Sequence, residues 1–252
     1  MSTCPHCSAP TRENARFCGK CGASFTGEIL PRKPRPQAAT YIQTMAPALY
    51  LWGLLVLSNV IIGLYIHFSK NTSPKSTLAL LGVDSFLILL FVAIKSPRTF
   101  RLLRLPGRIP RVVLDVLGTT ALLFLFIKIY SRVLSSTGFE FMDYLPEYRN
   151  AGWPLWVPFF TIALWPALFE ELTFRGLIFE KLSMVGTQRE AIILSSLLFS
   201  IIHLMPAVFI SHFIIGLAFC NLRVTHKSLY PSMAAHFLYN STVLLDEIVR
   251  RG

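Results

Sequence analysis

Charged residues are scarce in this 252-residue chain: they make up 15% of it, whereas soluble domains typically carry about 25%. Acidic residues are the scarcer kind, with 13 Asp and Glu against 24 Lys and Arg, for a net charge of +11. Hydrophobic residues reach 53%, and the mean hydropathy is +0.55. We therefore expect a polytopic membrane protein. The basic residues lie in loops between apolar runs, so topology and anionic lipid headgroups explain them better than a nucleic-acid partner.

A secretory signal peptide is also not evident, and neither is an internal repeat. The first apolar run begins near Met45, behind a polar segment rich in cysteine. Beyond residue 21 the chain has one cysteine, Cys220, which we expect to be a small buried residue in an apolar span. Four parts follow from this pattern: a compact head (1–26), a basic proline-rich linker (27–44), N-terminal transmembrane helices (45–150) and a C-terminal transmembrane core (151–252).

Long apolar runs fill the chain after residue 45. A membrane span needs about 20 mostly apolar residues, and the sequence predicts about seven transmembrane helices, within a range of six to eight. The candidates are 45–68, 77–95, 112–134, 155–173, 190–205, 206–223 and 229–248. Only Met205 and Pro206 separate the fifth and sixth, so these two should form a tight hairpin.

The loops predict the orientation. The segment 95–111 carries six basic residues and no acidic one, which is typical of the cytoplasmic side. The loop after the third span carries Glu140, Asp143 and Glu147 against Arg149, which suits the outer side. The amino terminus is then cytoplasmic. Arg250 and Arg251 would fall outside if there are seven spans, and an eighth element would change that.

The head contains two Cys-x-x-Cys pairs, with the spacing Cys4-x2-Cys7-x10-Cys18-x2-Cys21. Four thiolates spaced in this way can close a tetrahedral zinc site. A head this small cannot build a sufficient core, so the metal would supply its folding energy. Disulfides are the alternative, but the predicted cytoplasmic side is reducing. The segment resembles the zinc ribbons found at the ends of many bacterial membrane proteins, and four protein ligands imply a structural site.

Two adjacent glutamates, Glu170 and Glu171, lie inside one of the most apolar stretches. A carboxylate in hydrocarbon indicates a functional site by default. Glu171 and Arg175 are four residues apart and can pair on one helix face. Glu170 lies about 100° around the helix and is left without that partner, which suits a general base. A purely structural Glu–Arg clamp between helices is the alternative.

Histidines and an asparagine lie on the later spans. His203 ends Phe199-Ser-Ile-Ile-His203, and His236 and Asn240 are four residues apart, so they share a helix face. A lone histidine in an apolar helix is more often structural. Polar groups on several spans, however, normally face one another or a wet cavity.

A depth estimate supports that convergence. If the helix of Glu170 runs to about Met184 and turns at Gly186, Glu170 and His203 lie at equal depth in an antiparallel hairpin. His212 lies at a similar level across the Met205-Pro206 turn, and Asn240 also reaches it. The estimate predicts one shared cavity, with His236 one turn nearer the cytoplasm.

These residues, in this order and on separate spans, look like the CPBP family of intramembrane proteases, which includes the type II CAAX prenyl endopeptidases and the Abi and lysostaphin-resistance-like proteins. The match covers roughly residues 155–245. The resemblance implies an intramembrane endopeptidase that hydrolyses a peptide bond of a membrane-associated, CAAX-type or other, peptide or protein substrate. It also implies a plasma-membrane protein of bacterial type.

The resemblance implies roles as well. Glu170 would activate water, His203 would position it, and His236 and Asn240 would stabilise the oxyanion. Glu171 and Arg175 would brace the helix, with His212 nearby in support. We favour a mechanism without a catalytic metal over one in which the same residues bind catalytic zinc. Non-enzymatic alternatives are a transporter and a bacteriocin-immunity protein. The head could recruit a cytoplasmic partner, and the lipid bilayer is the surrounding medium.

Overall fold

The computed structural model describes residues 2–4, 8–11, 38–69, 74–139, 141 and 143–251. The chain divides into two units, Met1–Gln37 and Ala38–Gly252. Each unit is described by itself.

The described part of the first unit is a small hairpin. Strands β1 (Ser2–Thr3) and β2 (Pro10–Thr11) pair antiparallel, with Ser2 opposite Thr11. The Ser8 N–H donates to the Cys4 carbonyl (2.8 Å), and the Cys4 N–H donates to the Ala9 carbonyl (2.9 Å). Cys4 is buried under this turn, a placement that fits a thiolate ligand. Cys7, Cys18, Cys21 and the predicted linker residues 27–37 lie outside the described residues.

The second unit is helical. Its elements are α1 (Ala38–Ser69), α2 (Pro74–Lys95), η1 (Pro97–Leu102), α3 (Ile109–Ser135), α4 (Leu145–Asn150), α5 (Trp156–Pro158), η2 (Phe159–Leu164), α6 (Trp165–Glu171), η3 (Leu172–Ile178), α7 (Phe179–Val185), α8 (Gln188–Ile201), η4 (Pro206–Val208), α9 (Phe209–His226) and α10 (Tyr230–Arg251). The prediction that residues 38–44 belong to a linker is wrong, because α1 begins at Ala38. The proline-rich run ends at Pro36, and the residues after it can form helix.

The all-α polytopic fold is confirmed. Among the described residues, five helical stretches are long and apolar enough to cross a membrane: Thr40–Tyr65, Leu78–Lys95, Ile109–Ser135, Trp156–Val185 and Pro206–His226. The other two predicted spans correspond to α8 and α10. At 14 residues, α8 is about 21 Å long, short of a bilayer core of about 30 Å. Helix α10 has 22 residues and is less apolar because it carries His236, Asn240, Asp246 and Glu247.

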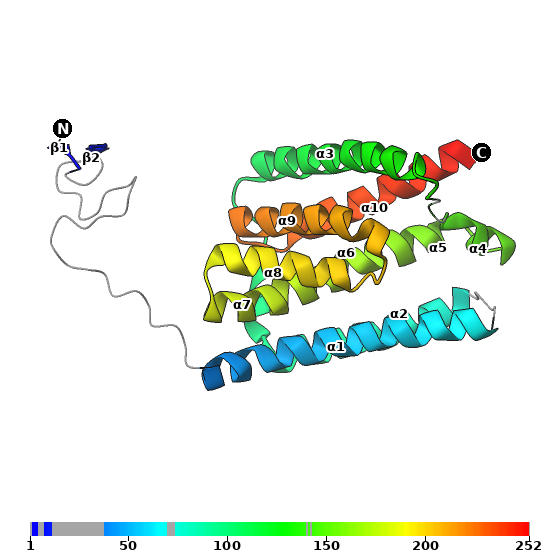
Figure 1. Cartoon of the computed structure of the whole chain (residues 1–252), viewed down its shortest axis with the longest axis horizontal. Coiled ribbons are helices and arrows are strands. Elements are labelled where there is room, and N and C mark those ends of the chain that lie inside the picture. Colours follow the sequence, from blue (N-terminus) through cyan, green and yellow to red (C-terminus); the bar gives the residue numbers. More distant parts are fainter. Residues whose placement is uncertain are drawn as a thin grey trace. The chain divides into compact units, whose positions relative to one another are not determined.

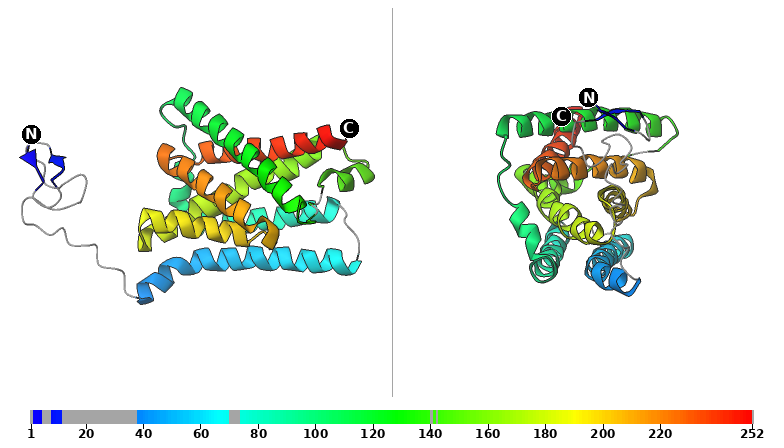
Figure 2. Two further views of the ribbon diagram at one scale, coloured as in Figure 1. Left: turned by 45° about the horizontal axis from the view of Figure 1, so that its top comes forward. Right: turned by 90° about the vertical axis from the view of Figure 1, so that its left-hand side faces the viewer.

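The helices pack as one bundle (Figures 1 and 2). Helices α1 and α2 lie side by side, α3 packs on α10, and α8 forms a hairpin with α9. Polar side chains connect the pair α1–α2 to the rest: the Trp52 indole donates to the Leu198 carbonyl (3.0 Å), and the Trp165 indole donates to the Ser85 hydroxyl (2.5 Å). Such contacts bridge helices where lipid provides no hydrophobic drive for association.

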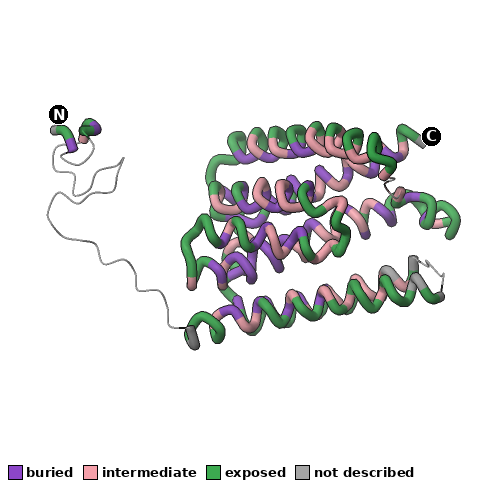
Figure 3. Tube along the Cα trace, in the orientation of Figure 1, coloured by how far each residue is buried: buried purple, intermediate pink, exposed green. Residues whose placement is uncertain are grey.

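Burial separates the central helices from the outer ones. Buried residues are concentrated in η3 and in parts of α8, α9 and α10, whereas α1, α2 and α3 show exposed stretches along their lengths (Figure 3). Large apolar side chains on these outer helices, such as Leu57, Phe86 and Leu114, are more than half exposed. A surface of this kind suits contact with lipid chains.

The fourth span is interrupted by wide helical turns. Helix α6 lies between η2 and η3, which are both π-helical, a feature that is frequent at functional sites. The helix then ends at Val185, beyond residue 173, where the sequence placed the end of the fourth span, and close to the Met184 that the depth estimate assumed. Gly186 follows, and α8 begins behind a capping box in which Thr187 and Glu190 satisfy each other's backbone N–H groups.

Candidate active site

Glu171 and Arg175 form a fully buried ion pair. Arg175 Nη1 lies 2.8 Å from Glu171 Oε1, and neither side chain is exposed. The i,i+4 spacing brings them together although η3 begins between them. The pairing predicted from the sequence is confirmed. Each group neutralises the other where an unpaired charge would be strongly unfavourable.

Aromatic rings enclose the Arg175 guanidinium. Its central carbon lies 4.3 Å from the centre of the Phe199 ring and 5.3 Å from that of Phe219, distances typical of cation–π contacts. Arg175 Nη2 also donates to the Gly216 carbonyl at 3.3 Å. The arginine therefore ties η3 to both α8 and α9.

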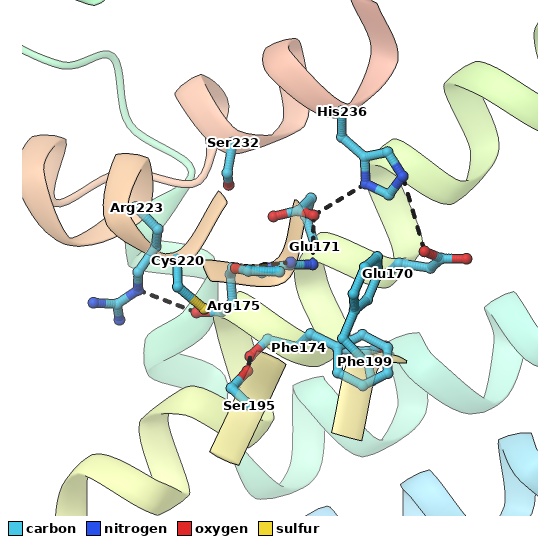
Figure 4. Close-up of polar contacts among 12 residues, drawn as sticks. Glu170, Glu171, Phe174, Arg175, Ser195, Phe199, Cys220, Arg223, Ser232 and His236 are labelled. Atoms are coloured by element: carbon cyan, nitrogen blue, oxygen red, sulfur yellow. Dashed lines mark hydrogen bonds and ion pairs between the residues drawn. The ribbon is translucent and has the colours of Figure 1, made fainter. Parts of the chain in front are cut away.

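His236 bridges the two glutamates (Figure 4). Its Nδ1 lies 3.0 Å from Glu171 Oε1, and its Nε2 lies 3.9 Å from Glu170 Oε2. A carboxylate that is paired with arginine accepts hydrogen bonds, so Nδ1 is the donor of the first contact. This fixes the ring with Nε2 toward Glu170. Glu171 is closed off, whereas the Glu170 side chain is 31% exposed.

The rings of His203 and His212 lie against each other, with centres 3.9 Å apart and planes tilted by 47°. Each is held by a backbone carbonyl four residues earlier: His203 Nδ1 lies 2.8 Å from the Phe199 oxygen, and His212 Nδ1 lies 2.9 Å from the Val208 oxygen. A carbonyl only accepts, so both Nδ1 atoms carry the hydrogen. Each neutral ring therefore has Nε2 as an acceptor.

Asn240 is oriented by the fourth span. Its Nδ2 donates to the Ile162 carbonyl, in π-helical η2, at 2.8 Å. The i→i+5 pattern of a π-helix frees carbonyls from the regular ladder, and such an oxygen can accept from a side chain. The same amide nitrogen carries a second N–H for another partner.

One cavity of about 910 Å³ collects these groups. Five of the residues that the sequence singled out line it: Glu170, His203, His212, His236 and Asn240. They come from α6, the turn after α8, α9 and α10. Glu171 and Arg175 lie behind this wall. The shared cavity follows the depth estimate, while the roles of its residues stay predictions.

Two details of that estimate are wrong. His203 lies in the turn after α8, which ends at Ile201, and not within a span. His236, expected one turn nearer the cytoplasm, is the residue that contacts both glutamates. The estimate assumed regular helices, but the π-helical turns on either side of α6 change the rise per residue.

Several cavity residues were missed. Lys128 and Asp246 both line it, and Lys128 Nζ lies 2.9 Å from Asp246 Oδ1. Both fall inside predicted spans, so the signal that singled out Glu170, a charge within an apolar run, could have found them. Phe199 was noted only as part of a motif. It also stacks edge-on against His203 and His236.

Within the described part of the chain, no group of three or more His, Cys, Asp or Glu residues is arranged to hold a metal ion.

Comparison with protein families gives two matches. Residues 152–242 match the family described as type II CAAX prenyl endopeptidase Rce1-like. Residues 3–25 match the zinc-ribbon domain. No curated protein and no solved structure matches the chain significantly. The first match contains all five cavity residues that the sequence proposed for the site, and the second contains all four clustered cysteines.

Proposed function

Because residues 152–242 form an Rce1-like domain, of a family of peptide hydrolases, we propose that the chain is an intramembrane endopeptidase whose attacking water is activated by Glu170. One observation carries the assignment. Of two adjacent glutamates, Glu171 is closed off in an ion pair, and Glu170 reaches the cavity beside His236. A carboxylate that reaches a cavity can take a proton from water.

His203 supports the base. Its Nδ1–H is held by the Phe199 carbonyl, so Nε2 is available to accept a hydrogen bond from water. Water held by Glu170 and His203 attacks the scissile carbonyl carbon as its proton passes to Glu170. The amide C–N bond then breaks, and that proton passes to the leaving amine.

His236 and Asn240 stabilise the oxyanion that forms in between. Glu171 accepts from His236 Nδ1 and holds the ring with Nε2 turned toward Glu170 and the cavity, where Nε2 donates to the oxyanion when it carries a proton. Asn240 is oriented by the Ile162 carbonyl and retains a second N–H. Donors held in place before the reaction are worth most in a site that excludes water.

Glu171 and Arg175 act as positioning residues. Glu171 reaches no cavity atom, but it fixes the tautomer and direction of His236. Arg175 holds Glu171 in place and is itself fixed by Phe199 and Gly216. This network links α6, α8, α9 and α10 around the reacting groups.

The zinc-ribbon match indicates zinc binding at the amino terminus. We infer that Cys4, Cys7, Cys18 and Cys21 hold one structural zinc ion. With four thiolate ligands the metal has no open position for substrate, so it supplies folding energy rather than chemistry.

The deciding experiment compares membrane peptides in cells that express the wild-type chain or Glu170→Gln. Peptides that accumulate only with the wild type identify products and substrate. The matched control is Glu147→Gln, at an exposed position of α4, which should give the wild-type pattern. If Glu170→Gln leaves the peptide pattern and the cellular phenotype unchanged, the protease assignment fails.

A further inference from the structure

The cavity has a deep end and an open end. At the deep end lie Phe199 and His236, which are 1% and 4% exposed. At the other end its lining includes Ser135, Gly138, Tyr144 and Arg250, all exposed. We call these four residues the mouth. It lies where α3 and α10 end and where the chain leads into α4.

Charged contacts hold the border of the mouth in place. Lys128 of α3 contacts both carboxylate oxygens of Asp246 on α10, at 2.9 and 3.0 Å. Buried Glu247 accepts the backbone N–H groups of Tyr144 and Leu145, at 3.0 and 2.9 Å, and so fixes the start of α4 to α10. The border is therefore polar and carries both signs of charge. That surface suits a hydrated peptide strand.

The basic loop, residues 95–111, lies at the opposite ends of the same helices. The Leu229 N–H, beside the start of α10, donates to the Leu102 carbonyl at 3.0 Å, and the Ser228 hydroxyl donates to the Arg104 carbonyl at 2.7 Å. Helix α3 begins at Ile109, directly after the loop, and ends at Ser135 in the mouth. Its 27 residues span about 40 Å, enough to cross a bilayer core of about 30 Å. The loop and the mouth are therefore on opposite faces of the membrane.

The distribution of charged residues indicates which end of the helix bundle faces the cytoplasm. The basic loop holds Lys95, Arg98, Arg101, Arg104, Arg108 and Arg111. The α7–α8 hairpin turns on the same face, because Glu180 of α7 accepts from Ser96 and Thr99, and it adds Lys181 of α7 and Arg189 of α8. The 136–155 segment near the mouth has three acidic residues and one basic residue. An excess of Lys and Arg in short loops marks the cytoplasmic face.

We propose that the cavity opens to the extracytoplasmic face and takes its substrate there, as a hydrated peptide segment of a membrane-anchored protein. This rests on the proposed protease function and narrows it. A prenylated tail on the cytoplasmic face would meet the basic side of the molecule, at the opposite end of α3 and α10 from the mouth.

Thiol labelling in intact cells tests the proposal. Thr137→Cys lies beside the mouth without lining it, and Leu105→Cys lies in the basic loop; both positions are exposed, and neither change removes a charge. A membrane-impermeant maleimide should modify Thr137→Cys in intact cells and Leu105→Cys only after permeabilisation. Mass spectrometry of peptides identifies the labelled site and separates it from native cysteines.

The reverse pattern, protection of Thr137→Cys in intact cells, or labelling of both positions there would overturn the proposal. A second pair, Ser136→Cys and Gly107→Cys, repeats the test if one variant fails to accumulate. Thiol labelling does not depend on protease activity, so the labelling pattern should be the same when the cysteine variants also carry Glu170→Gln. If labelling contradicts the proposal while Glu170→Gln abolishes cleavage, the protease stands and only the side of access is wrong.

Discussion

Glu170 and Glu171 are neighbours in the sequence, but the fold gives them different surroundings. Glu171 lies between Arg175 and His236 with no exposed surface, and Glu170 reaches the cavity. The i,i+4 spacing to Arg175 makes this division predictable from the sequence. The contact of His236 with Glu171 was not predictable, because it depends on how α10 crosses α6.

The two glutamates should respond differently to the same substitution. Glu171→Gln leaves the Arg175 charge buried without a counterion, which costs about 3–5 kcal/mol in buried pairs. We expect a clear drop in the thermal unfolding midpoint and loss of cleavage. Glu170→Gln should abolish cleavage and leave the midpoint near that of the wild type. Thermal unfolding of purified protein measures both, and equal midpoints for the two variants would contradict the division.

Asn240 provides a second test at this scale. Removing one oxyanion donor typically lowers kcat about 10²–10³-fold, so Asn240→Ala should lose activity to that extent with a smaller change in KM. The matched control is Ser241→Ala, the next residue on α10, which should keep wild-type kinetics. The measurement uses a substrate found in the peptide comparison. A change confined to KM would show that Asn240 binds substrate without acting on the oxyanion.

At the scale of elements, the close crossing of α8 and α9 sets the position of Arg175. A Cβ added at Gly216 would lie 2.8 Å from Ser196 Cβ and 3.0 Å from Ser196 Cα, closer than packed atoms tolerate. The Gly216 carbonyl also accepts from Arg175. Glycine at position 216 therefore allows α8 and α9 to pack closely, and its carbonyl holds the Arg175 side chain.

Gly216→Ala should push α8 and α9 apart. Overpacking of this kind costs about 1–3 kcal/mol, so the unfolding midpoint should fall, and cleavage should fall with it because Arg175 loses its support. Gly118→Ala is the matched control, since a Cβ there meets nothing within 4 Å and alanine favours helix. A Gly216→Ala protein with wild-type stability and activity would mean that the helices adjust freely.

The sequence was sufficient to predict which segments form long helices. It was not sufficient to predict where the shorter helices end or where the helical turns widen. Apolar runs located α1, α2, α3 and α9, since each is long and continuous. The end of α8 before His203 and the π-helical turns around α6 depend on packing between helices, which leaves no periodic trace in the sequence. The residues proposed as catalytic were singled out because polar groups are costly in hydrocarbon, a signal independent of these details.

At the scale of the whole molecule, the two units should depend on zinc differently. The described core of residues 38–251 is held by helix packing and buried polar contacts such as Glu171–Arg175. The head has too few residues for such a core. The sequence therefore predicted that bound zinc stabilises the head and that helix packing stabilises the membrane part.

Zinc removal should separate the two units functionally. We expect about one zinc ion per full-length chain, lost in Cys4→Ser, because four thiolates complete one tetrahedral site. A chain of residues 38–252 should bind no stoichiometric zinc and should still cleave the substrate after chelation, since the proposed chemistry assigns the oxyanion to His236 and Asn240. Metal analysis by mass spectrometry and a cleavage assay provide the two readings. The contrary result would be stoichiometric zinc in the shortened chain, with cleavage lost when the zinc is removed and restored when it is added back. That result would make the cavity a metal site and overturn the assignment of water activation to Glu170 alone.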